Sequence, residues 1–116
     1  VKDFITSQLS QFICEHIKAQ LAHKDDRILE AAFHEEALRN PQLAAAIRAL
    51  DNSFISSIDN FFRALGSHSA NADAHQVLAI IKFLEYQYLI RGEINETEVF
   101  DIISTTVGRI VKALQN

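Results

Sequence analysis

Interruptions of regular structure are rare in this 116-residue chain, which contains three glycines and one proline. Between these breaks the apolar residues recur at intervals of three and four, which is the spacing of one face of an α-helix. No stretch alternates apolar and polar residues for long enough to predict a half-buried strand. We therefore expect an all-α domain whose five helices lie at about residues 2–22, 26–39, 41–65, 72–91 and 96–114.

Several helix ends carry their own signals. Asn40 followed by Pro41 predicts the start of the third helix, because Asn is a strong N-cap and Pro is favoured at the first helical position. Gly66 and Gly92 predict the ends of the third and fourth helices, since glycine is the usual residue at a helix C-terminus. Asn95 has a glutamate three residues later, a capping-box pattern that opens the fifth helix.

Composition narrows the class of protein. The chain is 48% hydrophobic and 22% charged, the balance of a globular domain, and we read residues 1–116 as one domain. The single Cys14 cannot form an internal disulfide and fits a reducing compartment. The formal net charge of -4 argues against nucleic-acid binding by this segment, because phosphate binding needs a concentrated positive surface. Without a long apolar run or a signal pattern, we expect a cytoplasmic protein with no membrane partner.

The segment 72–91 carries two apolar stripes on opposite faces of one helix. They consist of Val77, Ile81, Leu84 and Tyr88 on one side, and of Ala79, Phe83, Tyr86 and Ile90 on the other. In a domain of five helices, one face can pack on the core. The other face needs a second layer of the same chain or another copy of the molecule.

The last helix shows a similar pattern. Its two neighbouring stripes are Val99, Ile103, Thr106 and Ile110, and Phe100, Ser104, Val107 and Val111. Both helices could instead be wholly interior, but five helices rarely enclose two of their number. We favour a homodimer in which two helices from each subunit form a four-helix bundle. The expected interface comprises Ala79, Phe83, Tyr86, Ile90, Phe100, Ser104, Val107, Gly108 and Val111, with Ser104 and Gly108 small enough for close helix approach.

The sequence contains little that indicates a metal site or a catalytic site. Glu30 and His34 are spaced i, i+4 and could ligate a metal, but without a third clustered ligand a solvent-facing pair is the better interpretation. The chain has no nucleophile elbow, no glycine-rich phosphate loop and no HExxH motif. We therefore expect no metal, no cofactor and no enzymatic activity.

Some polar residues lie beside apolar stripes and need partners. Glu36 is expected to bond either to Arg39, three residues later, or to a buried backbone group, and Glu85 is expected to pair with Lys82, three residues earlier. His16 lies on the apolar face of the first helix. It is either a satisfied interior histidine or a hydrogen-bonding group in a ligand cavity.

The pattern Glu36-x-x-Arg39-Asn40-Pro41-x-Leu43 stands between a short helix and a long amphipathic one. It resembles the C-terminal regulatory domain of TetR-family transcriptional repressors of bacteria. The layout downstream agrees: a long helix, a polar loop, then two apolar helices separated by a tight turn. The resemblance covers essentially the whole chain as an order of helices. It implies that the last two helices form the dimer bundle and that a DNA-binding helix-turn-helix domain, absent from this chain, precedes Val1.

The resemblance also implies a mechanism. A small molecule in a cavity among the first four helices would favour one arrangement of the subunits. It would thereby change the spacing of the two DNA-binding domains. Candidate cavity residues on inward stripes are Phe12, His16, Phe33, Phe54, Phe61 and Tyr88. Their aromatic character favours an apolar or aromatic effector. The alternative is a helical adaptor that binds another protein and has no small-molecule ligand.

Overall fold

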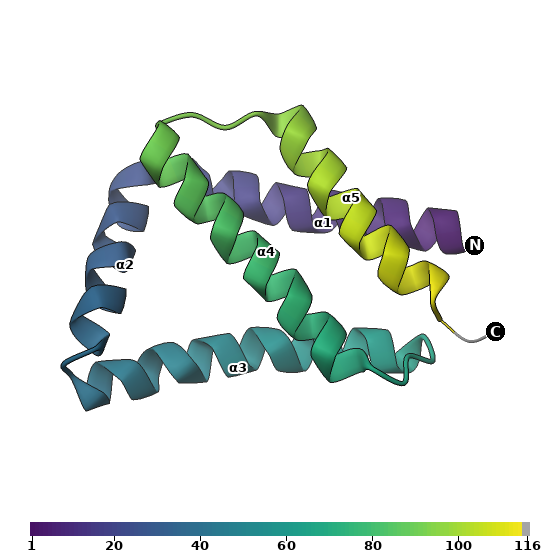
Figure 1. Cartoon of the computed structure of the whole chain (residues 1–116), viewed down its shortest axis with the longest axis horizontal. Helices are drawn as coiled ribbons and strands as arrows, with labels where there is room; N and C mark the ends of the chain where they lie inside the picture. The colour runs from purple at the N-terminus through teal and green to yellow at the C-terminus, as the bar shows by residue number, and fades with distance from the viewer. Residues whose placement is uncertain (115–116) are drawn as a thin grey trace.

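The computed structural model describes residues 1–114, which form five α-helices and no strand (Figure 1). The expected all-α class with five helices is confirmed. The helices are α1 (Lys2–Leu21), α2 (Lys24–Ala37), α3 (Pro41–Ala64), α4 (Ala70–Arg91) and α5 (Glu96–Lys112). Each bound lies within two residues of its expected place. No helix in residues 1–114 has the length and apolar character needed to cross a membrane.

The ends of α3 are set by local chemistry. The Asn40 side-chain oxygen accepts hydrogen bonds from the backbone N–H groups of Gln42 and Leu43, both at 3.1 Å. These bonds satisfy donors that have no partner within the helix. Gly66 follows the helix with φ = 94°, a conformation that costs glycine little and side-chain-bearing residues more.

The turn between α4 and α5 follows the same logic. Gly92 takes φ = 78° and its N–H donates to the Tyr88 carbonyl at 2.7 Å, which ends α4. Asn95 then caps α5 by accepting from the Glu98 N–H at 3.0 Å. Both ends were predicted correctly from the residue types.

The five helices form two layers. In Figure 1, α4 and α5 lie in front of α1 and α3, while α2 joins the latter two at one edge. The Cα atoms extend over 45 × 31 × 15 Å, and the shortest extent matches two helices packed at about 8–10 Å between axes. α4 packs mainly on α3 and α5 mainly on α1, and α4 and α5 contact each other much less. The outer face of the front layer therefore has no cover from its own chain.

The core lies between the two layers. Its largest fully buried apolar side chains are Ile13, Ile17, Phe62, Val77, Ile103, Val107 and Val111. α2 contributes no buried residue, so it closes the edge of the domain without entering the core.

The molecule is more open than its length requires. Its radius of gyration is 15.2 Å, against about 13 Å for a compact chain of this length. It exposes 7634 Å², whereas a monomer of 13.1 kDa exposes about 6,400 Å². The chain therefore exposes more surface than a compact monomer of its mass.

Candidate functional site

One face of α4 is apolar and exposed. The inward stripe of Val77, Ile81 and Leu84 is buried, as predicted. On the opposite side, the exposed fractions of Phe83, Tyr86 and Ile90 are 57%, 59% and 69%. Together with Ala79, which is also exposed, these three residues form a surface that we call the α4 outer stripe. The rings of Phe83 and Tyr86 stack on each other with centroids 6.5 Å apart, so the stripe presents a joined aromatic surface.

The corresponding stripe on α5 is partly buried and partly exposed within the single chain. Val107 and Val111 are at most 1% exposed within the single chain, in the face of α5 that packs on α1. A Cβ on Gly108 would lie 3.6 Å from Thr6 Cγ2, so the close helix approach that Gly108 permits is made by α1 of the same chain. The structure thus removes Val107 and Val111 from the surface available to a partner, because α1 already covers them. Phe100 remains exposed and Ser104 is half-buried.

The six residues expected to line an effector cavity do not form one group. His16 is exposed on α1 and is not an interior histidine, and its ring centroid lies 6.4 Å from that of Phe54 on α3. Tyr88 is half-buried on the same side of α4 as the core. Phe12, Phe33 and Phe61 are 68%, 47% and 39% exposed. The ring of Phe61 lies against that of Phe62, at 5.7 Å between centroids.

Two cavities are found elsewhere, and none of those six residues lines either of them. The first, which we call the α4/α5 cavity, has a volume of about 600 Å³ and lies between the α3–α4 loop, the first half of α4 and the second half of α5. The second has a volume of about 420 Å³ and lies between α1 and the start of α5. The pattern of apolar stripes missed both cavities because much of their lining comes from polar side chains and turns.

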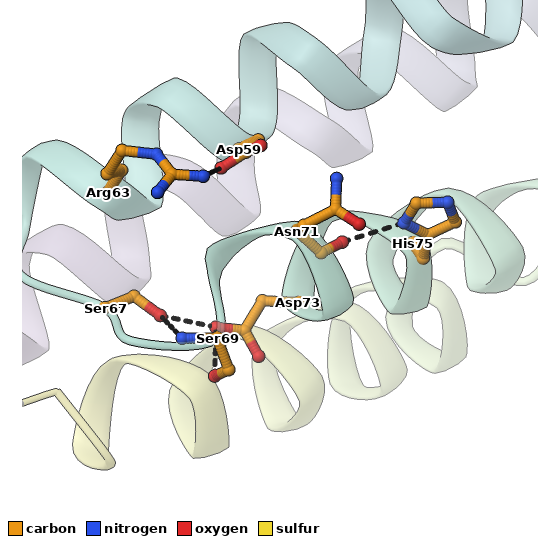
Figure 2. Close-up of polar contacts among 7 residues, drawn as sticks. All are labelled: Asp59, Arg63, Ser67, Ser69, Asn71, Asp73 and His75. Atoms are coloured by element: carbon orange, nitrogen blue, oxygen red, sulfur yellow. Dashed lines mark hydrogen bonds and ion pairs between the residues drawn. The ribbon is translucent and has the colours of Figure 1, made fainter.

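A polar network borders the α4/α5 cavity (Figure 2). The Ser67 hydroxyl donates to Asp73 Oδ2 at 2.9 Å, and the Ser69 hydroxyl donates to the same oxygen at 3.2 Å. The Ser69 backbone N–H donates to the Ser67 hydroxyl at 3.1 Å. Asp73 lies in the first turn of α4, where a carboxylate is favoured by the helix dipole. The network therefore holds the α3–α4 loop against α4 and fixes one wall of the cavity.

The second cavity contains the single thiol. Burial, and secondly the nearby Glu15 carboxylate, raise the pKa of Cys14. Lys18 beside it is paired with Glu96 at 3.3 Å, which ties α1 to the start of α5. Because a raised pKa disfavours the thiolate, this environment does not activate Cys14 as a nucleophile.

Glu85 lies where α4 faces α2. The expected pair with Lys82 does not form, because Lys82 instead reaches Asp51 on α3 at 2.8 Å. Burial, and secondly the Glu30 carboxylate, raise the pKa of Glu85. Arg27 lies near both carboxylates and pairs with Glu30. The helix-helix contact thus contains two carboxylates around one guanidinium.

The remaining polar predictions have simple outcomes. Glu36 pairs with Arg39 at 3.1 Å, as expected. His34 Nδ1 hydrogen-bonds to the Glu30 backbone oxygen at 2.8 Å, which occupies one ring nitrogen of the i, i+4 pair. Within residues 1–114, no three His, Cys, Asp or Glu side chains are grouped so that they could hold a metal ion.

Comparison with known proteins gives the family. No curated protein and no solved structure matches the chain. The family model described as "Tetracyclin repressor-like, C-terminal domain" matches residues 6–113, which is nearly the whole chain, and its match agrees with the five-helix fold. The chain belongs to the family of tetracyclin repressor-like (TetR-like) C-terminal domains.

Proposed function

We propose that this domain senses a small-molecule effector and holds two subunits of a TetR-like transcriptional repressor together. TetR-like C-terminal domains are the ligand-binding and dimerisation parts of transcriptional regulators in general. The proposal adds that this chain forms a homodimer and that effector binding changes the geometry of DNA-binding domains outside it.

The observation that supports a homodimer is the exposed α4 outer stripe. Two aromatic side chains and an isoleucine, each more than half exposed, follow one face of a helix that is buried on its other face. Exposed apolar patches of this kind are typical of protein–protein interfaces, in which Tyr and Phe are enriched.

The surface area supports the same conclusion. The chain exposes about 1,200 Å² more than a compact monomer of its mass. A stable interface of standard size covers about 800 Å² on each partner. A second copy packed on the α4 outer stripe would therefore remove about two-thirds of the surface that the chain has in excess. Two-fold pairing brings the same stripe from both subunits together.

Sedimentation velocity tests the dimer. We expect the chain to sediment as a dimer at about 100 µM, and Phe83→Glu to weaken dimerisation at least tenfold, or about 1.4 kcal/mol, because it places a charge in an apolar interface. Leu38→Glu is the matched control, since Leu38 is 83% exposed but lies beyond the end of α2. A wild-type monomer at that concentration would refute the dimer, and one that pairs only with a different protein would favour the adaptor interpretation.

The effector part of the proposal rests on one pair of aromatic side chains. His16 and Phe54 approach each other from α1 and α3. An aromatic effector held between them would contact both helices of the rear layer. An effector shifts the equilibrium between two subunit arrangements only by its difference in affinity for them, and about 1–3 kcal/mol changes operator occupancy five- to a hundredfold.

A further inference from the structure

The α4/α5 cavity has the size and the lining of a small-molecule site. Its volume of about 600 Å³ lies within the range of about 300–1,000 Å³ that is usual for ligand pockets. Ile80, Ile110 and Leu114 supply apolar surface, while Gln76, Thr106 and His68 supply hydrogen-bonding groups. The cavity is separate from the His16–Phe54 pair, because neither residue lines it.

Arg109 is the cation of the cavity. It projects from α5, and within residues 1–114 it forms no ion pair with any carboxylate. Asp73 lines the same cavity, yet the two charges are not within ion-pair distance of each other. A guanidinium presents several N–H donors in a plane and binds a carboxylate through two of them. Among residues 1–114, the Arg109 guanidinium is therefore not engaged by a carboxylate and is placed to bind an anion in the cavity.

Asp73 supplies the complementary group on the other wall. Both seryl hydroxyls donate to its Oδ2 atom. Its Oδ1 atom accepts no hydrogen bond from residues 1–114 and can accept a donor from a ligand. A ligand that fits both walls needs an anionic group for Arg109 and a hydrogen-bond donor for Asp73.

We propose that the α4/α5 cavity binds a small organic acid that carries a carboxylate, a hydroxyl or amino group, and an apolar body. The carboxylate bonds to Arg109, the hydroxyl or amino group donates to Asp73, and the apolar body packs on Ile80 and Ile110. The chemistry is shared by hydroxy acids and amino acids.

The α4/α5 cavity lies beside the proposed dimer surface. Ala79 belongs both to the α4 outer stripe and to the lining of the cavity. α4 and α5 contact each other sparsely, so a ligand that bridges them would fix their spacing next to the proposed dimer surface. The binding site itself is formed within one chain and does not depend on the proposed dimer.

Three probes with the same apolar body separate the chemical requirements. Phenyllactate carries a carboxylate and a hydroxyl, phenylalanine a carboxylate and an ammonium group, and phenethylamine lacks the carboxylate. We expect the two acids to cause saturable backbone NMR shifts at Gly66, Gln76 and Thr106 at millimolar concentration, and phenethylamine to cause none. The acid that binds with the lower Kd indicates whether the site prefers a hydroxy acid or an amino acid.

Variants place the binding in the cavity. Arg109→Gln is expected to weaken binding of both acids at least about tenfold. Arg48→Gln, which changes an exposed arginine of α3 outside the cavity, is expected to leave it unchanged. Ala113→Trp is expected to abolish binding by filling the cavity, with an unchanged circular dichroism spectrum. The proposal is overturned if neither acid binds, if phenethylamine binds equally well, or if Arg109→Gln and Arg48→Gln behave alike. The monomer–dimer equilibrium is measured separately, so loss of the dimer and loss of this site are distinct results.

Discussion

The rings of His16 on α1 and Phe54 on α3 lie 6.4 Å apart and are tilted by 38° to each other. The backbones of α1 and α3 make no close contact within residues 1–114. The two side chains therefore meet across the space between helices that α2 joins at one end. A flat aromatic molecule bound between the two helices at this point would contact both rings.

We predict that Phe54→Ala and His16→Ala each weaken the binding of 1-naphthol, an uncharged aromatic probe, by about tenfold, or about 1.4 kcal/mol. The reason is that each substitution removes one of the two ring faces against which the probe packs. A fluorescence titration of 1-naphthol measures the effect. Phe4→Ala removes a 67% exposed phenyl ring at the far end of α1 and should leave binding unchanged. Equal affinity for all three variants would show that 1-naphthol does not bind between His16 and Phe54.

Phe61 and Phe62 form a natural pair of test and control for the core. Phe62 is fully buried, whereas Phe61 is 39% exposed and meets it edge to face. Phe62→Ala should lower the free energy of unfolding by about 3–5 kcal/mol, because it leaves a cavity between the layers. Phe61→Ala should cost clearly less, since water already reaches its ring. Urea unfolding at a fixed protein concentration compares them, and similar losses would contradict the assignment of Phe62 to the core.

Features set by a residue's immediate neighbours in the chain could be predicted from the sequence. The Asn40 and Asn95 caps and the Glu36–Arg39 pair all depend on residues within one turn, so spacing alone predicts them. The two faces of α4 also follow from spacing, because a helix fixes which side chains point in opposite directions.

Features that depend on which helix lies next to which could not be predicted in this way. Val107 and Val111 have the spacing of an apolar stripe whether α1 or a second copy covers them. Lys82 lies within reach of Glu85 along its own helix, but Asp51 on α3 offers a closer partner once the layers pack. Ser67 and Arg109 line the same α4/α5 cavity although they are far apart in the chain, and no local pattern connects them.

Substitution of Asn40 measures how much one helix N-cap contributes to the stability of the fold. Asn40→Ala removes both hydrogen bonds to the first turn of α3 and should cost about 1 kcal/mol of stability. Asn52→Ala changes an exposed asparagine within the same helix, where alanine is the better helix former, and should be neutral or slightly stabilising. Thermal or urea unfolding measures both. A loss at Asn52 equal to that at Asn40 would mean that the cap contributes nothing of its own.

Several charged groups surround Glu85. Glu30, Arg27 and His34 face it from α2, and Lys82 lies on its own helix. Burial and Glu30 raise its pKa, while Arg27, Lys82 and His34 oppose that shift without cancelling it. The folded chain therefore binds this proton more tightly than the unfolded chain does.

The sign of the pH dependence follows from this difference. When the folded pKa of a carboxyl group lies above its unfolded value, stability falls as the pH rises from the unfolded pKa, about 4.5 for Glu85, through the folded one. Glu85→Gln removes the ionisation, so we expect it to unfold at higher urea concentration than the wild type at neutral pH, with the difference shrinking as the pH falls towards 4.5. Glu93→Gln, at an exposed position between α4 and α5, should show no such trend. A difference between Glu85→Gln and wild type that stays constant with pH would mean that folding does not change the pKa of Glu85. A wild type that is the more stable at neutral pH would mean that the Glu85 carboxylate is stabilised in the fold, with Arg27 as the group positioned to do so.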